Sequence, residues 1–225
     1  SALSKLSAPR YHGTSRKGIF HENVSMSPLQ LILASTSPYR RNLMERLRVS
    51  FSTMDPDIDE TPRPDESAVQ RASRLAQSKC EAPSADGALI IGSDQVACLD
   101  GEILRKPGSA DNAIAQLMQC SDRTLVFWTA VSVRSTVTGH HKQRLVPCEV
   151  QMRPLTLLEI EHYVAADNPL DCAGSFKWES LGITLFQRIK TEDPTALEGL
   201  PLIALCELLR FHGLALPLSA QLTEH

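Results

Sequence analysis

The stretch Leu31–Arg41, LILASTSPYRR, predicts an apolar strand that runs directly into the start of a helix. Ser37 and Pro38 pair an N-cap hydroxyl with proline at the first helical position, which is typical of a helix N-terminus. The free N–H groups and positive dipole end of such a helix favour an anion. Arg40 and Arg41 add two cations to the same turn. We therefore expect a phosphate-bearing ligand here, although an ordinary surface turn can carry the same residue types.

The composition of the whole chain is that of a globular protein. Its 225 residues, 42% hydrophobic and 22% charged, suffice for one domain with a substantial core. The formal net charge of -3 argues against nucleic acid or an anionic membrane as the partner. No apolar run reaches the length of a membrane span, no secretory signal is visible, and the six scattered cysteines form no CxxC pair. These features favour a cytoplasmic protein with reduced thiols.

The alternation of apolar and polar residues predicts an α/β fold. Besides the first strand, we expect strands at 51–54, 88–92, 124–134 and 143–153, and helices at 38–48, 65–80, 111–119, 157–165 and 201–209. Asp65 is the expected cap of the second helix. Asp100 and Gly101 form a hairpin signal. The last two expected strands are joined around Gly139, which argues for a mixed rather than a purely parallel sheet, flanked by helices.

The expected division of the chain has one folded unit. Residues 28–216 form a single domain in this interpretation. Residues 1–27 are polar, basic and aperiodic, so we expect a disordered extension, either native or added for expression. Residues 217–225 are similarly unpatterned and are expected to form a tail.

Two charged residues stand where a ligand is expected. Asp94 follows the apolar run 89–91, and open α/β sheets place their ligand crevice at the ends of such strands. There it can orient or deprotonate a water, bind a divalent cation, or simply cap a turn. Lys79 falls seven residues after Ala72 and three after Ala76, on the apolar stripe of its helix. It either reaches into a cleft, extends past the helix end, or complements the helix dipole.

Two weaker signals lie in loops. Lys106 belongs to LRKPG, where Pro107 stiffens the backbone and can hold a cation in place. Glu60 lies in the acidic loop 55–66 and can share a metal with Asp94. Both features also occur in plain surface loops. The nucleotide motifs GxxxxGK[ST] and GxGxxG are missing, as is the GxSxG elbow, which argues against Walker ATPases, dinucleotide dehydrogenases and serine hydrolases.

Taken in order, several short motifs resemble those of the Maf family of nucleotide pyrophosphatases. The likeness runs from Leu31 to about Leu216 and rests on ASTSPYRR (34–41), DET (59–61), GSDQV (92–96), RKP (105–107), CAGSFKWES (172–180) and EGLPL (198–202). The motifs GSDQV and LPLIALCELLR are most similar to the branch of the family that acts on 7-methyl-GTP. Each fragment is unspecific, but their order and spacing together are highly specific.

The resemblance implies a fold related to inosine triphosphate pyrophosphatases, with two lobes around a deep cleft. It implies hydrolysis of a nucleoside triphosphate to monophosphate and diphosphate with a divalent cation such as Mg, Mn or Co, and it allows a homodimer. By position, Asp94 matches the family's general base. Ser35, Arg40, Glu60, Lys79 and Lys106 match phosphate-site and metal-site residues, and Tyr39, Gln95 and Glu179 match positions associated with base specificity. The alternatives are hydrolysis of dTTP, UTP or another modified nucleotide, and a nucleotide-binding regulator of cell division.

Physical chemistry gives a separate argument for a methylated base. Methylation at N7 makes guanine cationic, and a cation over an aromatic ring gains roughly 0.5–2 kcal/mol. Tyr39 can supply the ring, and Glu179 can accept hydrogen bonds from guanine while balancing its charge. Compared with this branch, tyrosine replaces tryptophan at 39, Ser180 replaces glycine, and Trp178 fills a slot often held by a small residue. These departures concern the base pocket and leave the phosphate machinery unchanged.

Overall fold

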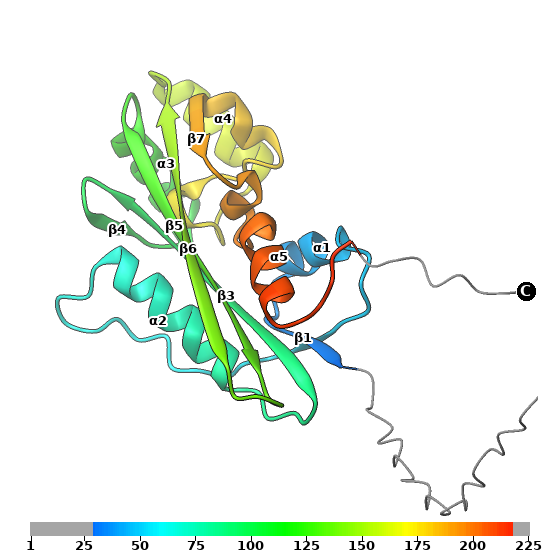
Figure 1. The fold of residues 1–225 in the computed structure, drawn as a ribbon. Coiled ribbons are helices and arrows are strands. Elements are labelled where there is room, and N and C mark those ends of the chain that lie inside the picture. The colour runs from blue at the N-terminus through cyan, green and yellow to red at the C-terminus, as the bar shows by residue number, and fades with distance from the viewer. Residues whose placement is uncertain (1–28, 218–225) are drawn as a thin grey trace, which may run out of the picture.

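The structure is a computed structural model that describes residues 29–217 and contains one seven-stranded sheet (Figure 1). The expectations for residues 1–27 and for most of the tail lie outside the described residues. The strands are β1 (Gln30–Ala34), β2 (Ser52–Met54), β3 (Ala88–Leu99), β4 (Glu102–Leu104), β5 (Thr124–Ser135), β6 (His141–Met152) and β7 (Phe186–Thr191). Their order is β2-β1-β3-β5-β6-β7, with β4 paired to β3. The pairs of β1 with β2 and β3 are parallel and the others antiparallel, so the expected mixed sheet is confirmed.

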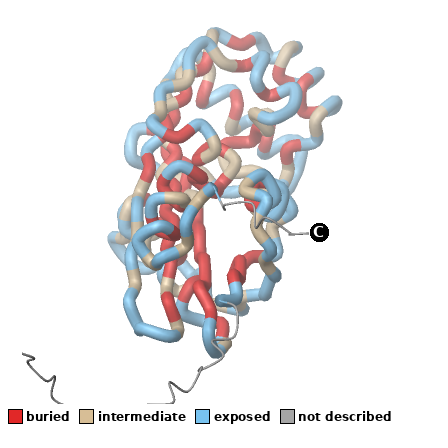
Figure 2. Tube along the Cα trace, turned by 45° about the vertical axis from the view of Figure 1, so that its right-hand side comes forward, coloured by how far each residue is buried: buried red, intermediate tan, exposed pale blue. Residues whose placement is uncertain are grey.

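Helices cover both faces of the long central strands (Figure 1). They are α1 (Pro38–Glu45), α2 (Ala68–Glu81), α3 (Ala110–Cys120), α4 (Leu157–Asp167) and α5 (Leu202–Phe211), with short 3-10 helices η1 (Ala173–Ser175), η2 (Leu181–Leu185) and η3 (Pro194–Glu198). Helix α2 packs on one face, whereas α1 and α5 lie on the other. Buried positions follow the central strands (Figure 2). Within residues 29–217, no helix has both the length and the apolar character needed to cross a bilayer.

The two largest clusters of buried residues lie toward opposite ends of the central strands. One cluster joins α3 and α4 to the strands and includes Leu117, Phe127 and Ile160. Another joins α1 and α5 to the strands and includes Leu43 and Leu205. Strands β3 and β5 contribute residues to both clusters, which agrees with the two lobes that the resemblance implied.

Three local expectations were wrong. Helix α2 is capped by Ser67, whose hydroxyl accepts from Gln70 N in a capping box, because Asp65 has a left-handed φ of 55° and cannot begin a helix. Helix α1 ends at Glu45 instead of 48. The strand expected to end at Gly92 continues to Leu99, so Asp94 lies inside β3, where it pairs with Ala130 of β5.

Gly92 decides how closely α2 approaches β3. A Cβ atom at Gly92 would lie 2.3 Å from the carbonyl oxygen of Ala76 and 2.5 Å from the amide nitrogen of Cys80. Only a residue without a side chain lets the helix backbone rest against the strand here. Gly92 and Asp94 point to the same face of β3 because side chains alternate along a strand. The close approach therefore brings Lys79 of α2 over Asp94.

Candidate active site

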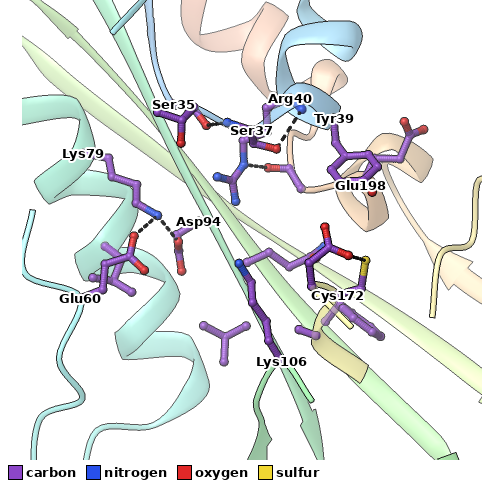
Figure 3. A pocket seen from close by; sticks show the side chains of 18 of the residues that line it. Ser35, Ser37, Tyr39, Arg40, Glu60, Lys79, Asp94, Lys106, Cys172 and Glu198 are labelled. Atoms are coloured by element: carbon purple, nitrogen blue, oxygen red, sulfur yellow. Dashed lines mark hydrogen bonds and ion pairs between the residues drawn. The ribbon is translucent and has the colours of Figure 1, made fainter. Parts of the chain in front are cut away.

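A cleft of about 890 Å³ opens between the two lobes (Figure 3). Its walls come from the β1–α1 turn, the acidic loop before α2, strand β3, the loop after β4 and the segments around η1 and η3. All nine residues expected at the site line it: Ser35, Tyr39, Arg40, Glu60, Lys79, Asp94, Gln95, Lys106 and Glu179. Residues separated by up to 144 positions in sequence, from 35 to 179, are thus gathered around one space.

Lys79 joins two carboxylates inside this cleft. Its Nζ lies 2.6 Å from Asp94 Oδ1 and 2.7 Å from Glu60 Oε1. The side chains of Lys79 and Asp94 are only 8% and 10% exposed, whereas Glu60 is 55% exposed. A lysine on the apolar stripe of a helix is tolerated because its charge is paired at the point of burial. The phase of Lys79 along α2 predicted that it points inward, and this prediction is confirmed.

The acidity of Glu60 follows from its neighbours. Partial burial is the largest single effect and raises the pKa of this carboxyl, but the hydrogen bond and charge of Lys79 and the charges of Arg40 and Lys106 together lower it more. The net result is a pKa below the ordinary value. Glu60 is therefore ionised at neutral pH, and three separate cations act on it.

The start of α1 is arranged as the sequence predicted. Ser35 Oγ accepts from Ser37 N at 3.1 Å, and Ser37 Oγ accepts from Arg40 N at 3.4 Å. The first turn contains no acidic residue, so the positive end of α1 faces the cleft without a side-chain counter-charge of its own. Arg41 does not contribute as expected, because it points to solvent and pairs with Glu45 at 3.3 Å.

Arg40 is held by the opposite wall of the cleft. Its Nε donates to the carbonyl oxygen of Gly199 at 2.9 Å. Burial lowers the pKa of the Arg40 guanidinium, while Asp94 and Glu60 oppose this change. A guanidinium keeps its proton under such conditions. Arg40 and Lys79 therefore present two fixed cations beside one carboxylate pair (Figure 3).

The carboxylates of Glu60 and Asp94 suit a small divalent cation. Within residues 29–217 there is no cluster of three or more His, Cys, Asp or Glu side chains that would cage a metal by themselves. Mg²⁺ is commonly held by one or two carboxylates together with substrate phosphates and water. Glu60 and Asp94 provide two such carboxylates, and both already converge on a single cationic atom, Lys79 Nζ. The residues present therefore fit a metal that binds together with a phosphorylated ligand.

The opposite end of the cleft is aromatic and acidic. Burial, followed by the negative field of Cys172, Asp171 and Glu179, raises the pKa of Tyr39 to about 12, so its ring stays neutral. Glu179 stands at the exposed mouth, yet partial burial raises the pKa of its carboxyl, and the charge of Glu198 raises it further.

Gln95 lines the cleft, and its side-chain amide group donates hydrogen bonds to the cleft wall. Its Nε2 lies 2.7 Å from Ala196 O, 3.2 Å from Leu197 O and 3.1 Å from Thr129 Oγ1. These bonds tie η3 to the central strands. Gln95 therefore shapes the pocket by fixing η3. The carbonyl oxygen of its side chain forms none of these bonds.

Sequence reasoning missed two arginines that hold the acidic loop. Arg71, which lines the cleft, donates to the carbonyl oxygen of Glu60 at 3.0 Å. Arg74 binds Glu66 at 2.5 Å and the carbonyl oxygen of Thr61 at 3.3 Å. Arg71 lies two helical turns before Lys79 on the same face of α2, and this spacing was the available signal. Together the arginines fix the loop that carries Glu60.

The Glu66–Arg74 pair gives a pH-dependent prediction for stability. The hydrogen bond from Arg74 lowers the pKa of Glu66 to about 2, against an ordinary 4.5. A lowered folded-state pKa means that this stabilisation is complete above pH 4.5 and disappears as the pH falls toward 2. Glu66→Gln should therefore unfold at lower urea concentration than the wild type at pH 7, and the gap between them should shrink from pH 5 to pH 3.5.

A matched control for this prediction is Glu45→Gln. Glu45 forms an exposed pair with Arg41, and such surface pairs contribute little. Its urea midpoint should follow that of the wild type at every pH. A gap between Glu66→Gln and wild type that stays constant across this range would contradict the assigned role of the ion pair.

Comparison with known proteins identifies the class to which this fold and cleft belong. A family model described as Maf-like protein matches residues 30–212. The chain belongs to the Maf family. A weaker structural likeness is to a HAM1 protein from Coxiella burnetii, with a TM-score of 0.40 and 13% identity over 55% of this chain and 73% of that one.

Among curated relatives, the matches extend over nearly the whole of each protein. The 7-methyl-GTP pyrophosphatase of Aromatoleum aromaticum is 51% identical over 190 residues, covering 84% of this chain and 98% of that protein. The 7-methyl-GTP pyrophosphatase of Xanthomonas oryzae pv. oryzae is 53% identical over 190 residues, covering 84% and 99%. That of Idiomarina loihiensis is 48% identical, covering 83% and 96%.

Proposed function

We propose that this chain hydrolyses 7-methyl-GTP to 7-methyl-GMP and diphosphate and so removes a modified nucleotide from the pool. The observation that carries this proposal is the separation of charge along the cleft. The residues involved all line the cleft: Arg40, Lys79 and Lys106 act together on Glu60, whereas Glu179 acts on Tyr39. A triphosphate attached to a cationic base has the complementary arrangement. Relatives about half identical to this chain carry the same activity in their names.

Bond cleavage in this proposal begins with water attacking the α-phosphorus in line with the departing diphosphate. Asp94 orients the water and takes its proton, and the bond from Lys79 to Oδ1 holds the carboxylate in position for this. Arg40, Lys79 and Lys106, with the N–H groups at the start of α1, offset the charge that builds up on the phosphate oxygens. Catalysis then rests mainly on positioning and electrostatics.

Glu60 and Asp94 are the residues proposed to hold a divalent cation, such as Mg, Mn or Co, together with the triphosphate. When bound, such a cation supplies positive charge to the phosphate oxygens and to the departing diphosphate. Arg71 and Arg74 keep the Glu60 loop in place for this purpose. The nucleotide is the one partner that the proposal needs, and a homodimer stays a prediction.

The base is held, in this proposal, by Tyr39 and Glu179. The neutral ring of Tyr39 offers its face to the cationic base. The ionised carboxylate of Glu179 accepts hydrogen bonds from guanine N1–H and the exocyclic amine. Ser35 completes the phosphate turn by fixing Ser37, and Gln95 fixes the wall behind the base.

The raised pKa of Glu179 predicts a pH-dependent affinity. A carboxyl with a raised pKa takes up its proton at a higher pH than an ordinary glutamate, so the ionised form is lost earlier on acidification. The KM for 7-methyl-GTP should therefore rise as the pH falls from 7 toward 5, while the KM for GTP changes less. Glu179→Gln should have a high KM for 7-methyl-GTP that no longer rises over this range. An acid-side KM rise that persists unchanged in this variant would contradict the role of Glu179.

Product analysis across a nucleotide panel tests the proposed function as a whole. The enzyme is incubated with 7-methyl-GTP, GTP, dTTP and UTP under Mg²⁺, Mn²⁺ and Co²⁺, and the products are separated. The proposal expects monophosphate and diphosphate, with the highest kcat/KM for 7-methyl-GTP. Preference for a pyrimidine would overturn the base assignment. Tight nucleotide binding without diphosphate release under every metal would instead support a nucleotide-binding regulator.

A further inference from the structure

Glu198 is a second glutamate that, like Glu179, lines the cleft. It is the last residue of η3. Its side chain is only 9% exposed. Both carboxylate oxygens accept from Arg46 Nη2, at 3.3 and 3.4 Å. Arg46 itself is 56% exposed, so solvent screens much of its charge. The shielded carboxylate is therefore only partly balanced by its partner.

The position of Glu198 is fixed by the surrounding backbone. Its neighbours on either side are held in place, since Leu197 O accepts from Gln95 and Gly199 O accepts from Arg40. Figure 3 shows Glu198 on the side of the cleft near Tyr39, away from Lys79 and Glu60. Gly199 has a left-handed φ of 94°, which favours glycine, and a Cβ there would lie in ordinary van der Waals contact with the Arg40 guanidinium, 3.4 Å from Nε. The turn at 198–199 thus holds the Arg40 guanidinium at Gly199 O and keeps Glu198 on the Tyr39 side of the cleft.

The two carboxylates of this end act on each other. The charge of Glu198 is the strongest of the neighbouring charges that raise the pKa of Glu179. Two like charges that act on each other are unfavourable unless a positive group lies between or beside them. Lys177 offsets part of this repulsion, but its Nζ is bound to the carbonyl oxygens of Asp167 and Asn168. The base end of the cleft is therefore short of positive charge when no ligand is bound.

We propose that Glu198 is a second specificity-determining residue, which with Glu179 selects a base that carries a fixed positive charge over a neutral base of the same shape. This inference rests on the proposed function and deepens it. Glu198 acts through its charge and not through a hydrogen bond to the base, because both of its oxygens are already bound to Arg46. In a partly shielded cleft, such a charge is felt over several ångströms.

The test compares two variants that break the same ion pair with opposite effects on charge. Glu198→Gln removes the carboxylate, whereas Arg46→Gln removes its cation and leaves the carboxylate in place. The substrates are 7-methyl-GTP and 7-methyl-7-deaza-GTP, which has the same shape and an uncharged base. The quantity measured is the ratio of their kcat/KM values at pH 6.5, where the methylated base keeps its N1 proton and its positive charge. We expect about a tenfold lower ratio in Glu198→Gln, and a ratio above the wild-type value in Arg46→Gln.

The acid limb of the pH profile gives a second readout. Removing the charge of Glu198 should lower the pKa of Glu179, so the rise of KM for 7-methyl-GTP should move to lower pH in Glu198→Gln. In Arg46→Gln the rise should move to higher pH. A purely structural role for the ion pair would affect both variants in the same direction, and that outcome would overturn the inference.

The outcomes also separate this inference from the proposed function. If wild-type enzyme prefers 7-methyl-GTP to its neutral analogue and Glu198→Gln keeps the full preference, the inference about Glu198 alone is wrong. If the wild type shows no preference for the charged base, both the inference about Glu198 and the proposed base assignment are wrong. Since Arg46→Gln leaves η3 and its carboxylate unchanged in sequence, it decides the question even if Glu198→Gln folds poorly.

Discussion

Asp94→Asn is expected to lower kcat for 7-methyl-GTP by about 10³-fold, because it removes the group that accepts the proton of the attacking water. Asparagine keeps the size of the side chain and an oxygen that can accept from Lys79 Nζ, which lies 2.6 Å from Asp94 Oδ1. The cleft should therefore keep its shape. Affinity for the triphosphate, measured without added metal, should change by less than about threefold, since Arg40, Lys79 and Lys106 are untouched.

This prediction needs binding and turnover to be measured separately. Single-turnover rates give the chemical step, and calorimetric titration with a non-hydrolysable 7-methyl-GTP analogue gives affinity. Asp86→Asn is a matched control, because Asp86 is an exposed carboxylate in the turn before β3 and does not line the cleft. It should retain wild-type rates. Wild-type turnover in Asp94→Asn would refute the assignment of the base.

Gly92→Ala should destabilise the fold by about 3 kcal/mol or more, the cost of forcing a methyl group into a closely packed contact. The added Cβ would meet backbone atoms of Ala76 and Cys80, at 2.3 and 2.5 Å, which cannot turn aside as a flexible side chain does. Either α2 moves away from β3 or the chain fails to fold. Urea unfolding followed by circular dichroism measures this loss directly.

The loss should extend to activity, because α2 carries Lys79. Moving the helix away from β3 separates Lys79 Nζ from the Asp94 carboxylate. Gly139→Ala is the control, since a Cβ there meets nothing within 4 Å and only the left-handed φ of 72° resists it. That cost is about 1–2 kcal/mol, without loss of kcat in the folded protein. A Gly92→Ala variant as stable and active as wild type would contradict the close contact.

The features predicted correctly from sequence are those that depend on local geometry. The Ser37–Pro38 helix start and the inward phase of Lys79 follow from residues within a turn or two. The hairpin at Asp100 and Gly101 is equally local: both residues have positive φ, at 50° and 88°, between strands β3 and β4. Such signals need no knowledge of the rest of the chain.

The features that were missed depend on tertiary partners. Gly92-Ser93-Asp94 has the composition of a turn, but pairing with β5 along its whole length extends β3 through it. Strand β7, Phe186–Thr191, has no clear alternation and exists because β6 offers it an edge. Arg71 contacts the Glu60 loop, and Glu198 contacts Arg46. These contacts join segments that are apart in sequence, so no local pattern predicts them.

The path of oxygen from water tests the central claim most directly. The enzyme is allowed to hydrolyse 7-methyl-GTP in H₂¹⁸O for a single turnover, and both products are analysed by mass spectrometry. Attack on the α-phosphorus beside Asp94 predicts one ¹⁸O atom in 7-methyl-GMP and none in diphosphate. Label in the diphosphate, or release of orthophosphate with 7-methyl-GDP, would contradict the account of how this cleft cleaves its substrate.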